Sequence, residues 1–334
     1  MPYPKFNEKH DPYMQRCMGD KEMNKKHSDQ KERYAVCQSF WDNRNKKKHP
    51  KSSLVRIEQS LYNTPWSIPV AYYDIYFNQY QNYLKAVVNG NIFSDLEYNA
   101  DPDSESEIEG LEDNKINGIP IISVDGTIGK HLSELEIMFG GIDLDTINKQ
   151  IADAKTDAEI KRVGMYFNTP GGIVVGTPET ADLIAELAKE KEVIGYADML
   201  CTSAGMWLAS QCSKFFVAGS ARIGSVNVYS IYLDNSKQLE TEGTVVNAIT
   251  GSFGKYKLTG ASFKKMTDDE KTMLQSQINA IESDFIFDVM KRGIKMEDCT
   301  GEIFDGETAV KKNFADGIIP TYDDFIEAVT SYTE

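Results

Sequence analysis

The sequence predicts an α/β fold made of strand–helix repeats, preceded by a mostly helical N-terminal segment. After residue 116, short apolar runs alternate with segments of helical periodicity, and turns rich in glycine or serine follow several of the apolar runs. The expected strands are 119–124, 163–167, 193–197, 215–217 and 245–249. The expected helices are 144–155, 177–191 with Pro178 in its first turn, and 267–292 with Asp268 and Asp269 in its first turn.

Composition narrows the class of protein. The chain has 334 residues, 41% hydrophobic residues and a formal net charge of −15, which argues against nucleic acid as a partner. The charge is uneven, because residues 1–57 carry fourteen basic and seven acidic side chains. The chain has no run of about 18 apolar residues, so no membrane span is predicted, and a cytoplasmic location is expected.

The chain divides into four expected parts: a basic Cys-containing segment at 1–57 with one or two helices between 11 and 41, an aromatic-rich helical segment at 58–98, an acidic linker at 99–115, and the main domain at 116–334. In the second part, the spacing after Trp66 suits a helix up to Val88.

The five cysteines do not have the pattern of a disulfide framework. Their number is odd and their spacing irregular, which favours a reducing compartment and small buried thiols. Cys17, Cys37 and His27 sharing a metal ion is the alternative, although no pair of cysteines has zinc-site spacing.

Ser203 stands at a predicted strand–turn–helix junction. The strand 193–197 leads through small residues into a helical pattern, so the hydroxyl would lie near the positive end of a helix dipole. An activated nucleophile is one interpretation, and a simple helix cap is the other.

A second turn, Pro170-Gly171-Gly172, follows the preceding strand of the predicted sheet. Glycines there allow a sharp turn and present backbone N–H groups, which suit the oxyanion of a tetrahedral intermediate. An ordinary turn is the alternative. Because neighbouring parallel strands end at the same sheet edge, the two turns are expected to lie together.

A serine nucleophile needs a base, and histidine is a poor candidate here. Only His131 lies within the main domain, and no histidine follows Ser203. A lysine base is the alternative, provided that burial lowers its pKa by several units. Lys255 and Lys257 lie in a glycine-containing loop before the last long helix and are the candidates, although loop lysines are usually solvated.

These motifs together resemble the signal peptide peptidase A family of serine peptidases, with the head maturation proteases of tailed phages as the nearest likeness. The order of the Gly171 turn, Thr202-Ser203-Ala204-Gly205, Ile223-Gly224-Ser225-Val226, Lys255-Tyr256-Lys257 and Phe304-Asp305-Gly306 carries the resemblance. The N-terminal segment resembles a short Cys-containing module of phage structural and processing proteins. The family's membrane-bound members have an N-terminal anchor that is not expected here, which favours the phage-type interpretation.

The resemblance implies a ClpP/crotonase-type fold and a role for each matched residue. Ser203 would be the nucleophile, Lys257 the general base with Lys255 as its rival, and Ser225 the residue that orients the dyad. Gly171 and Ala204 would supply the oxyanion N–H groups, and Gly172 would bind substrate. This chain departs from the pattern at Ala204, where many relatives have glycine, and at Asn227, where glycine is usual.

The implied function is a Ser-Lys endopeptidase without metal or cofactor. Its expected substrates are capsid, portal or scaffold proteins, cut in the host cytoplasm or inside assembling proheads. The resemblance also implies a homo-oligomer in which the lysine serves a neighbouring protomer's serine. The alternatives are a cytoplasmic protease like the signal peptide peptidases, an inactive protease-like assembly scaffold, and a crotonase-like acyl-CoA enzyme, which would not need Ser203 or Lys257.

Overall fold

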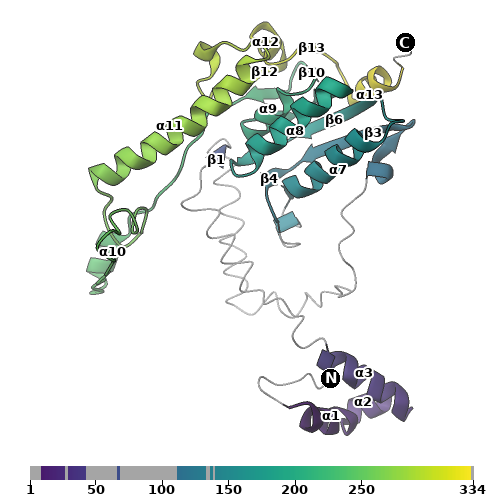
Figure 1. Cartoon of the computed structure of the whole chain (residues 1–334), viewed down its shortest axis with the longest axis vertical. Coiled ribbons are helices and arrows are strands. Elements are labelled where there is room, and N and C mark those ends of the chain that lie inside the picture. Colours follow the sequence, from purple (N-terminus) through teal and green to yellow (C-terminus); the bar gives the residue numbers. More distant parts are fainter. Residues whose placement is uncertain are drawn as a thin grey trace. The chain divides into compact units, whose positions relative to one another are not determined.

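The computed structural model describes residues 9–26, 29–42, 66–67, 111–132, 136–137 and 140–331 (Figure 1). The described residues fall into two compact units, a small N-terminal helical unit and a larger α/β unit that begins at residue 111 and includes 66–67. Each unit is described by itself. The helix expected from Trp66 to Val88 lies outside the described residues, except for Trp66–Ser67, which form a strand instead.

The described part of the N-terminal unit contains three helices, where one or two were expected between 11 and 41. Their bounds are α1 His10–Met18, α2 Lys21–Lys26 and α3 Gln30–Asp42. Five buried side chains form its core: Tyr13, Met14, Cys17, Met23 and Cys37. Tyr34 of α3 is 51% exposed, outside this core.

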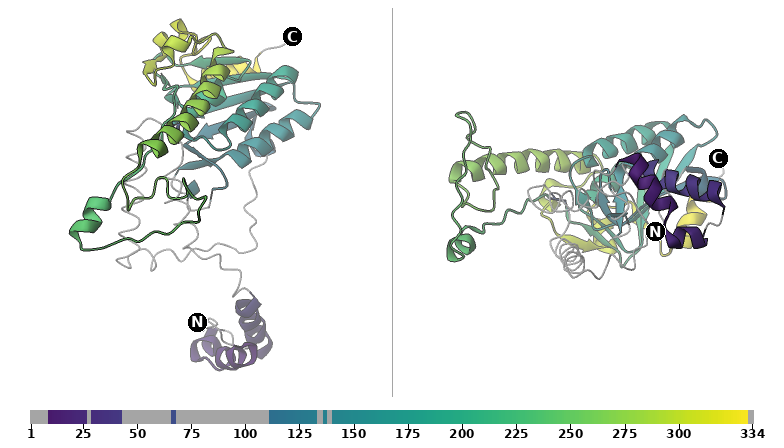
Figure 2. Two further views of the ribbon diagram at one scale, coloured as in Figure 1. Left: turned by 60° about the vertical axis from the view of Figure 1, so that its left-hand side comes forward. Right: turned by 90° about the horizontal axis from the view of Figure 1, so that it is seen from below.

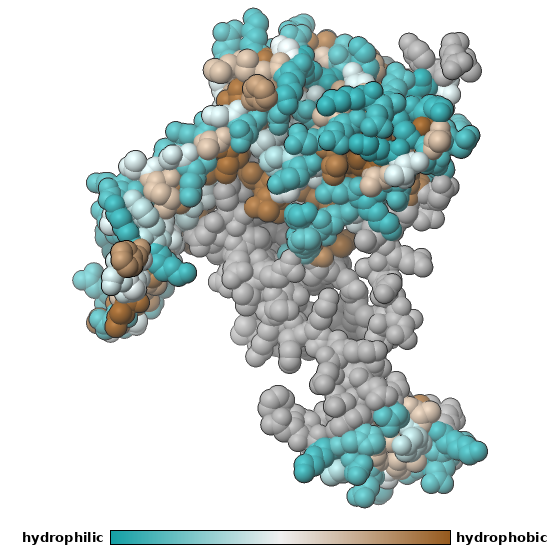
Figure 3. Space-filling model, viewed as in Figure 1, coloured by the Kyte–Doolittle hydropathy of each residue, from teal (hydrophilic) through white to brown (hydrophobic). Residues whose placement is uncertain are grey.

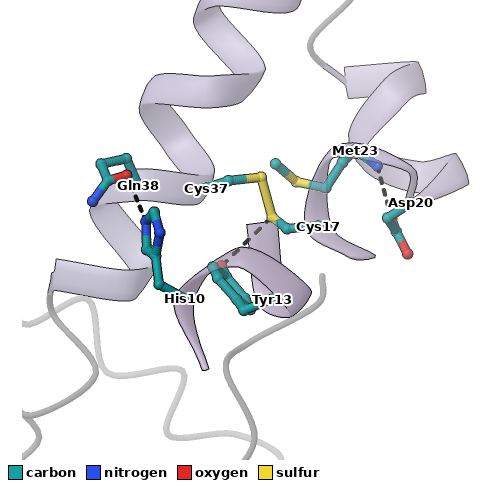
Figure 4. The surroundings of a disulfide bond; sticks show 7 residues. All are labelled: His10, Tyr13, Cys17, Asp20, Met23, Cys37 and Gln38. Carbon is teal, nitrogen blue, oxygen red and sulfur yellow. Dashed lines mark hydrogen bonds between the residues drawn. A yellow bond between two sulfur atoms is a disulfide. The ribbon is translucent and has the colours of Figure 1, made fainter. Parts of the chain in front are cut away.

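A disulfide joins α1 to α3 through Cys17 and Cys37, so the expectation of free thiols is wrong for this pair (Figure 4). The hydroxyl of Tyr13 points at the Cys17 sulfur at 3.5 Å, and His10 contacts Gln38 across the two helices. Oxidised sulfurs cannot act as thiolate ligands, which removes the alternative of a metal held by these cysteines. Cys201, Cys212 and Cys299 are free and buried, as expected.

The α/β unit is built on a six-stranded sheet in the order β13-β10-β8-β6-β3-β2, parallel except for the pair β2 and β3. The strand bounds are β2 Lys115–Ile116, β3 Ile119–Asp125, β6 Arg162–Asn168, β8 Glu192–Ala197, β10 Lys214–Val217 and β13 Gly317–Ile318. The first four strands expected from the sequence are thereby confirmed.

Helices cover both faces of this sheet (Figure 2). The main core lies on the face of α7, α8 and α9, and α13 packs on the other face through Phe325 and Val329. Side chains alternate as a strand requires: Ile122 faces the main core, whereas its neighbour Ile121 faces α13. The helix bounds are α7 Leu144–Thr156, α8 Thr177–Glu190, α9 Ala204–Ala209, α12 Gly306–Lys311 and α13 Tyr322–Thr330.

Two smaller sheets stand at the carboxyl ends of the main strands. One has the order β1-β7-β4-β5, and the other has the order β12-β11-β9. Their bounds are β1 Trp66–Ser67, β4 Thr127–Gly129, β5 Gly141–Asp143, β7 Gly172–Ile173, β9 Leu200–Thr202, β11 Arg222–Gly224 and β12 Ile303–Asp305. The short 3-10 turns are η2 Leu111–Asn114 and η3 Met296–Asp298.

The acidic segment expected at 99–115 ends earlier than predicted. Residues 99–110 lie outside the described residues, but Leu111 is buried in the main core, and Lys115 already belongs to β2. One apolar side chain among the acids is enough to anchor this end of the segment.

A long arm projects from the α/β unit (Figures 1 and 2). It contains α10 Ser236–Thr241, a loop, and the first part of α11 Asp268–Met290, whose start is fixed by a capping box between Thr267 and Glu270. The strand expected at 245–249 is not formed, since residues 244–251 have no regular structure and Val245 and Ile249 are 81% and 95% exposed. A strand needs a hydrogen-bonding partner, and no other described segment pairs with this one.

None of the helices in the described part of the chain is both long and apolar enough to cross a membrane.

Candidate active site

Ser203 occupies a strained turn between β9 and α9. Its backbone has φ 56° and ψ −118°, a conformation that non-glycine residues rarely adopt, and it is 1% exposed. Although Ser203 stands at the N-cap position, its side chain makes no cap hydrogen bond. The geometry therefore disfavours the helix-cap interpretation and matches the strand–turn–helix elbow that presents a nucleophilic hydroxyl.

Ser225 lies beside Ser203 because their strands are neighbours. Strands β9 and β11 are parallel, with Thr202 opposite Gly224, and the N–H of Ser203 donates to the Gly224 carbonyl at 2.8 Å. Ser225 has φ 55° and is buried, with its N–H bonded to the Glu302 carbonyl at 2.7 Å. This register places Ser225, the residue expected to orient the dyad, next to Ser203.

The Gly171 turn is tied to the same strand β9. Thr169 exchanges backbone hydrogen bonds with β9 on both sides, donating to Leu200 at 2.8 Å and accepting from Thr202 at 3.1 Å. The Thr202 hydroxyl donates to the Pro170 carbonyl at 3.0 Å. Gly171 has φ 96°, where a side chain would be strained, so glycine is required at this turn.

Thr169 is a residue that sequence reasoning missed. Its hydroxyl accepts the Gly171 N–H at 3.0 Å and donates to the Gly126 carbonyl at 2.5 Å. The expected oxyanion donor is therefore already bonded in this structure, and an incoming oxyanion has to compete with the threonine hydroxyl. A threonine next to Pro-Gly-Gly gave no sequence signal beyond that of a common turn.

Ala204 and Gly172, two further expected site residues, also lie at this junction. Ala204 is the first residue of α9, where helix geometry leaves N–H groups without intrahelical partners. Gly172 begins β7 against β4, and a Cβ built there would stand 1.9 Å from the Ile128 carbonyl oxygen. Cys201, two residues before the nucleophile, is fully buried, and burial raises the pKa of its thiol, which keeps it protonated and unreactive.

The structure does not bring Lys257 to Ser203 within one chain. Beyond Ser203, Trp207 of α9 stacks on Phe285 of α11 and donates its ring N–H to Asp288 at 2.7 Å. The loop that carries Lys257 lies at the opposite end of α11, where its neighbour Lys255 pairs with Asp269 at 2.8 Å. Sixteen residues of helix separate Phe285 from Asp269, which is about 24 Å at the usual rise. A four-carbon side chain is far too short to span this gap.

The rival bases have other partners. Hydrogen bonding to Asp269 raises the pKa of Lys255 to about 12, the opposite of what a general base needs. His131 pairs with Asp145 of α7, and its side chain is 69% exposed.

Asn227, the second departure from the family pattern, donates its amide to Glu282 of α11 at 2.7 Å.

No three His, Cys, Asp or Glu side chains come together as a possible metal site in the described ranges.

Comparison with known proteins identifies the domain. Residues 185–332 match the model of peptidase family S49, and Ser203, Ser225 and Lys257 all fall inside this stretch. These residues form a peptidase family S49 domain. The mixed α/β architecture, with parallel strands alternating with helices, is the ClpP-like fold of that family, as the sequence predicts. Gly171 and Gly172 precede the matched stretch, although the S49 domain packs against them through β9.

The similar proteins include three proteases. Capsid assembly protease C of Escherichia phage lambda is 28% identical over 212 residues, which cover 62% of this chain and 48% of the phage protein. A putative protease of Methanocaldococcus jannaschii is 31% identical over 172 residues, 50% of this chain and 54% of the archaeal protein. Protease 4 of Salmonella typhi is 26% identical over 202 residues, 58% of this chain and 31% of that protein. The chain thus spans about half, or less, of the length of these relatives.

Proposed function

We propose that the protein is a serine endopeptidase in which Ser203 is the nucleophile and Lys257 the general base. The observation that carries this proposal is the backbone of Ser203, which holds a buried, non-glycine residue at φ 56° without using its hydroxyl as a helix cap. Such strain persists only where the surroundings enforce it, and it is typical of catalytic turns. The S49 match and the protease relatives support the same conclusion.

In the proposed mechanism, neutral Lys257 takes the Ser203 proton as the oxygen attacks the scissile carbonyl, and it returns a proton to the leaving amine. Gly171 and Ala204 donate to the resulting oxyanion. Ser225, held by the neighbouring strand, orients the lysine amine. Water then attacks the acyl-enzyme. Lys257 takes a proton from the water and gives it to the departing Ser203 oxygen.

The dyad is completed between protomers. Because α11 keeps the Lys257 loop about 24 Å from the protomer's own α9, a lysine can reach Ser203 only from another copy of the chain. The arm has the surface that such an assembly needs, because Val245, Ile249 and Phe253 are exposed. Figure 3 shows apolar side chains at the end of the arm. An open hollow of about 680 Å³ lies between the Lys255 loop and the first turn of α11.

The proposed substrates are proteins of an assembling phage head, namely capsid, portal or scaffold subunits. The name of the lambda relative, a capsid assembly protease, supports this proposal. We place the activity in the host cytoplasm or inside the assembling head, with no cofactor and no nucleic acid partner.

Labelling of the nucleophile tests the proposal. A fluorophosphonate probe should modify the intact chain at Ser203 and not modify Ser203→Ala, while Ser220→Ala serves as the matched control because Ser220 lies on an exposed turn. In co-expression with candidate head proteins, the intact chain should shorten a substrate that Ser203→Ala leaves whole. Equal labelling of all three variants, or cleavage that survives Ser203→Ala, would show that Ser203 is not the nucleophile.

A further inference from the structure

Strand β1 adds to a sheet edge that leads directly into the candidate active site. Trp66 pairs with Ile173 and Ser67 with Gly172, in antiparallel register, so β1 is the outer strand of the sheet β1-β7-β4-β5. On its other side, β7 is held by β4 through the pairing of Ile128 with Gly172. If β1 leaves, the described part of the chain offers β7 no other partner on that edge.

The position of β7 makes this edge important for catalysis. Gly172 follows Gly171 directly, so the backbone of β7 continues from the proposed oxyanion donor. Because the two strands are antiparallel, β1 begins with Trp66 opposite Ile173 and continues with Ser67 opposite Gly172. Its direction is therefore toward Gly171. An extended polypeptide that paired with β7 in this direction would point its backbone at the Gly171 turn and Ser203.

Occupancy of this edge by the chain itself has two physical consequences. An edge strand can hold only one partner at a time, so β1 and an extended substrate exclude each other. A polypeptide that competes for the edge has to replace the pairing of Trp66 with Ile173 and of Ser67 with Gly172. Only molecules in which the edge is unoccupied can bind substrate there. The apparent affinity for substrate therefore falls in proportion to the fraction of such molecules.

We propose that Trp66–Ser67 is an internal occupant of the substrate-binding edge, and that it restrains the peptidase until a substrate displaces it. The restraint of the peptidase rests on the proposed function. The occupancy of the β7 edge by Trp66–Ser67 can be tested without measuring any activity.

The test is a disulfide lock across the strand pair. Residues directly opposite each other in antiparallel strands have Cβ atoms close enough for a disulfide, so Trp66→Cys combined with Ile173→Cys should cross-link on mild oxidation. The matched control is Ser67→Cys combined with Ile173→Cys, one residue out of register, where successive side chains point to opposite faces. Mass spectrometry of unreduced peptides measures both yields, and the three native free thiols are buried.

Cross-linking in the register pair and little in the control would establish the occupancy, and equal or absent cross-linking of both would overturn it. The oxidised register pair should then cleave casein about tenfold or more slowly than the same protein after reduction. Equal rates before and after reduction would refute the restraint while leaving the peptidase intact. A reduced protein that neither cleaves casein nor reacts with the fluorophosphonate would instead refute the proposed function.

Discussion

Mixing two inactive variants gives the sharpest test of a dyad shared between protomers. Ser203→Ala removes the nucleophile and Lys257→Ala removes the base, so each homo-oligomer should be inactive. In the structure, about 24 Å of α11 lies between Phe285, which stacks on α9, and Asp269, which pairs with the Lys257 loop, so a protomer is not expected to restore its own site.

The expected recovery follows from counting sites in a mixed ring. A site works only when its serine comes from a Lys257→Ala protomer and its lysine from a Ser203→Ala neighbour. In random one-to-one mixing, each condition is met in half of the cases, so about a quarter of the sites should be active in a head-to-tail ring. A site built within one protomer predicts no recovery at any ratio.

The assay dissociates the two variants, mixes and reassembles them, verifies mixed oligomers by native mass spectrometry, and measures casein cleavage. Unmixed variants taken through the same procedure are the controls. Verified mixed oligomers without activity would refute sharing, and a fully active monomer in sedimentation would refute the need for an oligomer.

Three other outcomes are expected. Lys257→Ala should abolish casein cleavage while Lys255→Ala retains it, and the reverse result would exchange their roles. Hydrogen bonding to Lys264 lowers the pKa of Glu270 to about 2; its contribution to stability is therefore complete above its ordinary pKa near 4.5 and is lost as the pH falls toward 2. Limited proteolysis of the arm should accelerate over that range, whereas a Glu270→Gln variant should be cut more readily at neutral pH and change little on acidification. Gly172→Ala should lower the free energy of unfolding in urea by about 3 kcal/mol or more, because its Cβ would meet a backbone carbonyl oxygen 1.9 Å away; an unchanged midpoint would contradict this.

The parts of the fold that depend on local pattern were predictable from the sequence. Strands β3, β6, β8 and β10 and helices α7 and α8 were predicted because apolar periodicity marks elements that bury a face in the same chain. Helix α11, which buries only Phe285 and Val289 among its apolar residues, was predicted with Asp268 and Asp269 in its first turn. The strand expected at 245–249 is not formed, because local pattern does not say whether a partner strand is present. Its apolar side chains are as strand-like as those of β8, but the chain provides no neighbouring backbone to pair with them.

Part of the geometry of the candidate site was predictable from the sequence. The strand order placed the Gly171 turn and Ser203 at one edge, and the structure confirms that arrangement through β9. The use of the Gly171 N–H by Thr169, and the strand formed by Trp66, depend on contacts between distant segments that no local pattern records.

The disulfide was missed because counting cysteines over the whole chain hid a pair within one small unit. A three-helix unit with five buried side chains has little apolar surface to stabilise it, so a covalent link between α1 and α3 replaces part of a core.

Two adjacent serines with positive φ have a consequence for how this protein tolerates change. A non-glycine residue held at such angles lowers the free energy of unfolding by about 1–3 kcal/mol. For Ser203 and Ser225 together this is large compared with the net stability of an ordinary domain, about 5–15 kcal/mol. The short strands β9 and β11 and the hydrogen bonds around them must supply that energy. Substitutions in these strands should therefore be removed by selection mainly because the protein no longer folds. The sequence around the nucleophile is constrained by stability as strongly as by chemistry, and a variant freed of the strain would gain robustness at the expense of its function.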